Sequence, residues 1–289
     1  MSRECLQVLR LPRGRIIELG QFPKIMGILN VTPDSFYRGS RVASSAVVDS
    51  AYTMIKGGAD ILDIGGESSR PGSLYVDADT ELERVVPAIE AIRARWDIPI
   101  SIDTRKAAVA EQALQAGADI VNDISALSED PALAGVCAQS GVPVILMHKK
   151  GIPATMQNQP YYEDCVKEVL ESLIAAADYA QVQGISHDAI VLDPGIGFGK
   201  SLENNIALMQ HIPDFIKIGY PVLIGISRKS SIGAITGKDP EGRLAGSLGA
   251  ACWAADRGAA IIRVHDVEAT VDALKVYCVF KGTYSPEQQ

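Results

Sequence analysis

The sequence predicts an α/β protein whose fold is a (β/α)8 barrel, and two observations carry this prediction. Eight short apolar segments recur along the chain, and each leads through a polar or glycine-containing loop into a longer amphipathic segment. Strand and helix patterns that alternate in this way are typical of a parallel sheet covered by helices. Eight such units fit a closed barrel better than an open doubly wound sheet, which usually has fewer strands.

Residues 1–20 precede this alternation and follow a different pattern. Polar and apolar side chains alternate on both sides of Pro12-Arg13-Gly14, in Val8-Leu9-Arg10 and in residues 15–18. A period of two interrupted by proline and glycine predicts a β-hairpin. We expect this hairpin to cover one end of the barrel.

The barrel units begin near Lys24. The eight segments with the length and apolar content of buried strands are residues 25–29, 60–64, 98–102, 119–121, 142–147, 189–192, 221–224 and 260–264. The helices expected with them are residues 44–56, 79–95, 106–116, 131–139, 161–183, 202–210, 244–257 and 267–280.

Glycine marks the end of several predicted helices. Gly58, Gly117 and Gly258 each stand before an alanine and the start of a strand, which suits a left-handed helix C-cap. No linker or low-complexity segment separates the units. We therefore expect one domain over residues 1–289, with a core from about residue 24 to residue 280.

Composition excludes several classes of protein. The chain of 289 residues has a formal net charge of -8 and no sustained basic stretch, which argues against a nucleic-acid partner. Its five cysteines are far apart and form no CxxC pair, so we expect reduced thiols and a cytoplasmic location. No apolar run reaches the roughly 18 residues of a membrane span, and no signal-like segment opens the chain, so we expect no membrane partner.

The stretch from Ala189 to Lys200 joins an apolar run to Asp193 and a glycine-rich turn. A phosphate-binding Walker loop needs a glycine five residues before the Gly-Lys pair, and Pro194 occupies that position. The stretch instead indicates a buried strand that delivers a carboxylate to its C-terminal end.

Polar residues follow the apolar run of every predicted strand, whereas we find no such pattern in the loops that lead from helices into strands. In a barrel the loops after the strands build the active site. The residues are Asn30, Asp34, Asp63, Glu67, Ser69, Arg70, Asp103, Asn122, Asp123, His148, Asp193, Ser227, Arg228, Lys229, Arg263 and His265.

The chemistry of this set describes a ligand. Asp103, Asp193 and the Asn122 amide offer acceptors and donors for a planar heterocycle with an amino-substituted, guanidine-like edge. Lys229 can hydrogen-bond a ring carbonyl or nitrogen, and Arg263 can stack on a ring while it faces an anion. No zinc spacing and no GxSxG motif occurs in the sequence. We therefore expect binding and formation of an electrophile, without a covalent enzyme intermediate.

A metal is expected on similar grounds. Asn30 and His265 do not have the charge of a metal cage built from protein alone. They fit a Mg²⁺ ion that is held mainly by a substrate's phosphates.

These motifs closely resemble dihydropteroate synthase over roughly residues 24 to 280. The resemblance rests on residues 26–36, 58–73, 101–104, 122–124, 147–148, 155–157, 193–200, 227–230 and 263–267. It implies a TIM barrel, usually dimeric, and a transferase of folate biosynthesis that is a sulfonamide target. The implied reaction joins 4-aminobenzoate to 6-hydroxymethyl-7,8-dihydropterin pyrophosphate with loss of pyrophosphate, through SN1-like departure of the leaving group.

The resemblance also implies the role of each residue. Pterin would be bound by Asp103, Asn122, Met147, Asp193, Lys229 and Arg263; pyrophosphate by Asn30, Arg70, Arg263 and His265; and 4-aminobenzoate by Ser69, Pro71, Phe198, Lys229 and Ser230. The catalytic residues would be Asp34, Arg70, Lys229, Arg263 and His265, with Asn30 at Mg²⁺.

The chain departs from the family pattern at several positions. Ser69 stands where threonine is usual, which we expect to alter sulfonamide discrimination, and Lys149-Lys150 stands where neutral residues are frequent. Two other readings share a pterin site. One is a methyltetrahydrofolate-dependent corrinoid methyltransferase, which would not need the Asn30-to-Phe36 loop, the Ser69-to-Pro71 loop and the 227–230 motif together. The other is a pterin-binding homologue without turnover.

Overall fold

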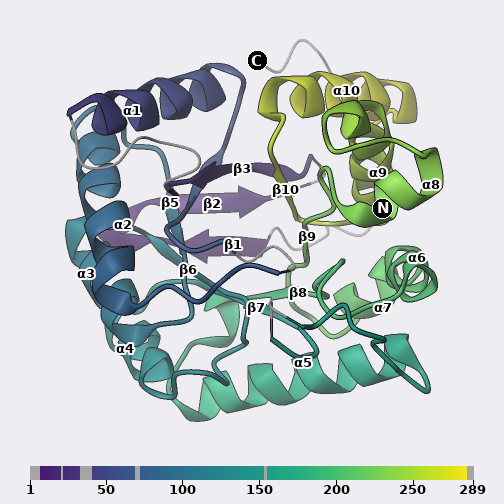
Figure 1. Ribbon diagram of the computed structural model, residues 1–289, viewed down its shortest axis with the longest axis horizontal. Coiled ribbons are helices and arrows are strands. Elements are labelled where there is room, and N and C mark those ends of the chain that lie inside the picture. Colours follow the sequence, from purple (N-terminus) through teal and green to yellow (C-terminus); the bar gives the residue numbers. More distant parts are fainter. Residues whose placement is uncertain (1–6, 21, 33–40, 69–71, 153–154, 285–289) are drawn as a thin grey trace.

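A closed ring of eight parallel strands forms the centre of the molecule (Figure 1). The computed structural model describes residues 7–20, 22–32, 41–68, 72–152 and 155–284. Hydrogen bonds join the strands in the order β8-β7-β6-β5-β4-β3-β10-β9, and a bridge between Leu192 and Val222 joins β8 to β9. The strands are β3 (Lys24–Asn30), β4 (Ile61–Gly65), β5 (Ile100–Asp103), β6 (Ile120–Asp123), β7 (Val144–Met147), β8 (Ile190–Asp193), β9 (Leu223–Ile224) and β10 (Ile261–Val264).

The predicted hairpin is confirmed and closes the N-terminal end of the barrel. Strand β1 (Gln7–Arg10) pairs antiparallel with β2 (Ile16–Leu19). The hairpin buries apolar side chains against residues near the beginnings of the barrel strands and so covers this end of the barrel. The apolar cluster between the hairpin and the barrel consists of Leu9, Leu11, Ile17, Leu19, Met26, Ile61, Ile120, Ile145, Val191, Leu223 and Ile261.

Helices surround the barrel on the outside (Figure 1). The α-helices are α1 (Arg41–Lys56), α2 (Ala78–Arg93), α3 (Ala107–Ala116), α4 (Ala132–Ser140), α5 (Cys165–Val182), α6 (Leu202–Gln210), α7 (Ile212–Ile216), α8 (Ser230–Thr236), α9 (Leu244–Asp256) and α10 (Val267–Lys281). Short 3-10 helices are η1 (Pro12–Gly14), η2 (His187–Ala189) and η3 (Glu241–Arg243). The apolar faces of the α-helices pack against the outer faces of the strands and form the main core.

The eight predicted strands and eight predicted helices are all present, with shifted ends. Helix α5 begins at Cys165 because the Asp164 carboxylate caps it, accepting a hydrogen bond from the Lys167 amide. Helices α7 and α8 were not predicted. The seven residues of α8 include a glycine and β-branched side chains, and Gly237 ends the helix in the left-handed region at φ 70°, so no amphipathic period can develop.

The glycine caps are also confirmed in the described chain. Gly58, Gly117 and Gly258 have φ of 94°, 115° and 91°. Four cysteines are free thiols, at positions 137, 165, 252 and 278, whereas Cys5 lies outside the described residues. Among the described helices, none combines the length and the apolar content that a membrane crossing requires.

Asp119, which the sequence predicts as the first residue of a strand, attaches the hairpin to the barrel. Its fully buried carboxylate precedes β6 and pairs with Arg93 at 2.6 Å, with Arg13 at 2.6 Å and with Arg15. These arginines come from the hairpin and from helix α2. Asp119 therefore fastens the hairpin to the barrel, and its role is structural.

Candidate active site

The C-terminal ends of the strands open into a cavity of about 640 Å³. Strand β3 ends there with Asn30, and β10 contributes Arg263. Six of the predicted site residues line this cavity: Asn30, Phe198, Lys229, Ser230, Arg263 and His265. The remaining described ones, Asp103, Asn122, Met147 and Asp193, lie at the same ends of β5, β6, β7 and β8.

Arg263 links two carboxylates at the bottom of the cavity. Its Nε donates to Asp63 Oδ2 and its Nη2 to Asp103 Oδ2, each at 2.6 Å. Burial opposes the charge of the guanidinium, but the two carboxylates outweigh burial and raise the pKa of Arg263. Its orientation is therefore fixed before any ligand enters.

Asp63 is a site residue to which the sequence assigned no role. It is fully buried in β4 and also accepts a hydrogen bond from the Asn122 amide, whose Nδ2 is 3.2 Å from Asp63 Oδ2. It follows two apolar residues, Ile61 and Leu62, inside β4, and nothing in this local pattern indicates a particular role. What distinguishes Asp63 is that Arg263, 200 residues later in the chain, reaches it.

The Asp103 carboxyl is poised between its two protonation states. Burial raises its pKa to about 7, and the adjacent Arg263 limits the rise. A carboxyl in this state can accept hydrogen bonds from an amino-substituted ring and can favour positive charge on that ring.

Asp193 is held by the turn that follows it. Its Oδ1 accepts from the Gly195 amide at 2.7 Å, while burial raises its pKa and Lys229 opposes that rise. Gly195 has φ of +68°, and a Cβ there would lie 1.9 Å from the His148 carbonyl oxygen. A Cβ at Gly199, which has φ of +65°, would likewise lie 2.1 Å from the Lys150 carbonyl oxygen. The glycines thus allow the turn to rest directly on the loop after β7.

Lys229 reaches across to this turn from the loop after β9. Its ammonium donates to the Ile196 carbonyl and lies 4.5 Å from the centre of the Phe198 ring. Burial lowers its pKa to about 8, and Asp193 opposes that change. Phe198 in turn packs with Ile124, Met147 and Met156, which joins the predicted pterin and aminobenzoate sides of the site.

Lys200 supports the turn from beneath. Its buried Nζ lies 2.9 Å from the Gly195 carbonyl, 3.1 Å from the Phe198 carbonyl and 3.0 Å from His148 Nδ1. Burial lowers the pKa of Lys200 to about 7 and that of His148 to about 3. The sequence indicated Lys200 only as part of a failed Walker motif, and nothing in its spacing reveals this internal role.

Two loops on the opposite side are joined by an ion pair. Arg228 donates from Nε and Nη2 to the Asp266 carboxylate, at 2.8 and 2.6 Å. Next to this pair, Ser227 Oγ lies 3.2 Å from both the backbone nitrogen and Nδ1 of His265. The loop that carries Lys229 and the loop that follows Arg263 are therefore held together by these contacts.

Four predicted site residues, Asp34, Ser69, Arg70 and Pro71, lie outside the described residues. Among the described ones, no group of three or more His, Cys, Asp or Glu could hold a metal ion. Asn30 and His265 line the cavity with Arg263. Such a donor set fits a cation that takes most of its ligands from phosphate oxygens.

The fold and the buried arginine-carboxylate cluster at the barrel mouth define the protein as a (β/α)8 barrel with a ligand-binding site at the strand ends. Comparison with known proteins identifies its family. The model of the pterin binding enzyme family matches residues 26–265, and the chain belongs to this family. A dihydropteroate synthase from Synechocystis is 48% identical over 269 residues, which is 92% of this chain and 93% of that protein.

Solved structures agree. A dihydropteroate synthase from Xanthomonas albilineans with 4-aminobenzoic acid has a TM-score of 0.89 at 44% identity, covering 96% of this chain and 99% of that one. The same enzyme in complex with 7,8-dihydropteroate has a TM-score of 0.84 at 43% identity, covering 93% and 97%. The relative and the solved structures named here are thus dihydropteroate synthases.

Proposed function

We propose that the protein is a dihydropteroate synthase, which condenses 6-hydroxymethyl-7,8-dihydropterin pyrophosphate with 4-aminobenzoate to give 7,8-dihydropteroate and pyrophosphate. The observation that carries the proposal is the Arg263 guanidinium, which is fixed between Asp63 and Asp103 at the base of a cavity that Lys229 and Phe198 also line. Relatives with this activity match nearly the whole chain.

The pterin is assigned to the buried side of the cavity. Asp103, Asn122 and Asp193 would bind its amino-substituted edge, Lys229 its ring carbonyl or nitrogen, and Met147 one of its faces. Two buried carboxyls near a ring stabilise positive charge on it, because the low-dielectric surroundings strengthen their field. A pterin held there would therefore form a cation more readily than in water.

The pyrophosphate is assigned to the cavity wall made by Asn30, Arg263 and His265. Arg70, for which the sequence predicts the same role, lies outside the described residues. Arg263 would stabilise charge on the leaving group, since its guanidinium stays protonated. We propose that Asn30 binds Mg²⁺ together with the phosphates. When bound, the ion neutralises phosphate charge.

The 4-aminobenzoate is assigned to Phe198, Lys229 and Ser230, with Ser69 and Pro71 outside the described residues. The bond from the pterin methylene carbon to oxygen breaks, and pyrophosphate leaves with the electron pair. The amine nitrogen then attacks the cation, a carbon-nitrogen bond forms, and the nitrogen loses a proton. An arylamine is nucleophilic enough that no strong general base is needed.

The test is formation of product. Purified protein is mixed with the dihydropterin pyrophosphate, labelled 4-aminobenzoate and Mg²⁺, and labelled dihydropteroate is separated and counted. We expect turnover that depends on both substrates and stops when Mg²⁺ is chelated and resumes when it is restored. Absence of product from folded protein would contradict the proposal and leave a pterin-binding homologue without turnover.

We also propose that the protein acts as a homodimer in the cytoplasm. Helices α9 and α10 pack together and leave Trp253, Val276 and Phe280 exposed, and we assign the contact between two copies to this face. The free thiols of the described cysteines are consistent with a reducing compartment.

A further inference from the structure

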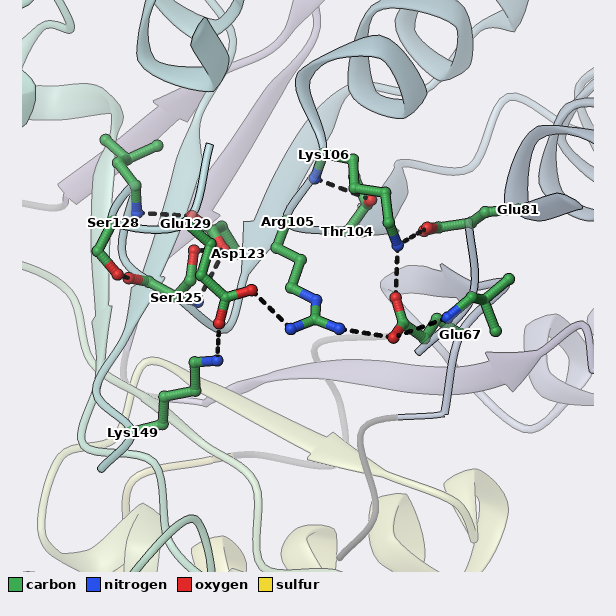
Figure 2. A network of polar contacts seen from close by, with 12 residues as sticks. Glu67, Glu81, Thr104, Arg105, Lys106, Asp123, Ser125, Ser128, Glu129 and Lys149 are labelled. Carbon is green, nitrogen blue, oxygen red and sulfur yellow. Dashed lines mark hydrogen bonds and ion pairs between the residues drawn. The ribbon is translucent and has the colours of Figure 1, made fainter. Parts of the chain in front are cut away.

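A chain of charged side chains runs along the rim of the barrel beside the active site (Figure 2). It includes Lys149, one of the two lysines for which the sequence offered no role. Three cations alternate with three carboxylates, so the charges balance and the set is not an anion-binding site. The members are Glu67, Glu81, Arg105, Lys106, Glu129 and Lys149, from the loops after β4, β5, β6 and β7 and from α2.

Arg105 is the centre of this chain. Its Nη2 donates to Glu67 Oε1 and its Nη1 to Glu129 Oε2, each at 2.6 Å, in opposite directions (Figure 2). The planar guanidinium can bridge two carboxylates in this way, whereas a lysine ammonium is a single point charge. Only one tenth of the Arg105 side chain is exposed.

The carboxylate on one side of Arg105 holds both ends of the connection between β4 and α2. Glu67 lies at its beginning, and Glu67 Oε1 also accepts from the Val76 amide, near its end, at 3.3 Å. The neighbouring Tyr75 ring lies over the same cations, 5.3 Å from the Arg105 guanidinium and 4.7 Å from Lys106 Nζ. The described parts of this connection therefore rest on Arg105 and Lys106.

The Glu129 carboxylate, on the other side of Arg105, is oriented by its ion pair with Lys149. Glu129 accepts from both Lys149 and Arg105, and these two cations lower its pKa against the effect of burial. The Lys149 side chain is only 7% exposed, which is unusual for lysine. Lys150 differs, since its half-exposed side chain turns to the Tyr161 carbonyl at 2.6 Å.

The network reaches the site through a small cavity and through Ser68. Glu67, Asp103 and Arg105 line one small cavity of about 10 Å³, so the network lies against the carboxyl assigned to the pterin. Ser68, which follows Glu67, lines both this small cavity and the large one.

We propose that Arg105 is a positioning residue, which holds Glu67, Ser68 and residues 72–77 against the pterin side of the site. Glu129 and Lys149 fix the orientation of the Arg105 guanidinium. This inference rests on the proposed function for its kinetic consequence, but not for its structural one. If the segment is loosened, substrate binding must order it again, which raises KM while the reacting groups keep their chemistry.

The experiment compares wild type with Arg105→Gln, Arg105→Lys and Lys149→Met by steady-state kinetics and by hydrogen exchange. We expect Arg105→Gln to raise KM for the pterin substrate about tenfold with kcat within about threefold, and to speed amide exchange in residues 66–77 more than elsewhere. Arg105→Lys should not rescue, because one ammonium cannot bridge two carboxylates. Lys149→Met should also raise KM for the pterin substrate, by about threefold.

Lys150→Met is the matched control, since it removes the neighbouring lysine outside the network. We expect wild-type KM and wild-type exchange in residues 66–77. Unchanged exchange there in Arg105→Gln, full rescue by Arg105→Lys, or an equal effect of Lys150→Met would each overturn the inference. If Arg105→Gln does not fold, Lys149→Met carries the test. Lack of turnover in wild type would contradict the proposed function, and the exchange measurement would still decide the positioning role.

Discussion

At the scale of single residues, the site depends on ionisable groups whose surroundings differ although their types are ordinary. Asp63 and Asp103 both contact Arg263, yet Asp63 is covered completely while Asp103 lines the small cavity beside the site. We infer that Asp63 orients the arginine and that Asp103 remains available to a ligand. The two lysines divide in the same way, with Lys229 lining the large cavity and Lys200 supporting the turn beneath it.

Lys229→Ala and Asp193→Asn test the assigned pterin contacts. Each change removes a buried charged partner, which costs about 2 to 5 kcal/mol, so kcat/KM should fall roughly 30-fold to several thousand-fold. Steady-state kinetics with both substrates measures the loss, and circular dichroism verifies the fold. Near-normal kcat/KM in either variant would remove that residue from the site.

The pH dependence follows from the same groups. Burial raises the pKa of Asp103 to about 7, so the carboxyl is protonated below that pH, and burial lowers the pKa of Lys229 to about 8, so the amine is neutral above it. If the reaction needs an ionised Asp103 and a charged Lys229, kcat/KM for the pterin substrate should fall on both sides of a narrow optimum between these values. Initial rates from about pH 5.5 to pH 9.5 measure this profile, with thermal melts at each pH as the control. A flat profile would contradict the assignment.

At the scale of elements, the N-terminal hairpin separates stability from catalysis. It covers the end of the barrel opposite to the cavity, through Leu9 and its neighbours, and Asp119 holds it by ion pairs. A change in the hairpin core should therefore affect folding and leave the chemistry of the folded protein intact.

Leu9→Ala tests this separation. Leu9 is 1% exposed, so its truncation should lower the free energy of unfolding by about 2 to 5 kcal/mol, while kcat/KM of the folded protein stays the same. Urea denaturation and kinetics measure the two effects. Ile16→Ala is the matched control, because Ile16 in the same hairpin is 51% exposed and its loss should change stability by no more than about 0.5 kcal/mol. Equal effects of the two variants would contradict the capping role.

The sequence predicted these elements well because strands buried on both faces leave a continuous apolar signal. The same signal placed Asn30, Asp103 and Asp193 at strand ends, where the structure has them. It placed Asp119 at the beginning of a strand and outside the site, but it could not reveal the role of this carboxylate, because contacts with Arg13 and Arg93, distant in the chain, define that role. Short helices such as α8 and internal supports such as Lys200 are likewise set by tertiary contacts, which leave no local pattern.

At the scale of the whole molecule, helices α9 and α10 present apolar side chains to solvent. Trp253 on α9 and Val276 on α10 are 40% and 56% exposed. Both helices lie outside the barrel, away from the hairpin and from the rim network of Figure 2.

Val276→Glu tests the proposed homodimer. A charge in the centre of an apolar interface should turn a dimer into a monomer, since the carboxylate would lose its hydration on association. Sedimentation velocity or light scattering measures the mass, and kinetics verifies that the monomer folds. A wild-type monomer at all concentrations would contradict the dimer, and a dimeric Val276→Glu variant would exclude this surface.

The turn after β8 has a consequence for inhibition and resistance. Added side chains at Gly195 and Gly199 would collide with backbone carbonyls at 1.9 and 2.1 Å, and both glycines have positive φ. Neither position can accept another residue unless the loop after β7 moves. That loop begins directly after Met147, which is assigned to a face of the pterin. An inhibitor that makes its contacts with the backbone of residues 195–199 would therefore face a surface that point mutation cannot easily remodel. Contacts made to exposed side chains at the cavity mouth have no such protection.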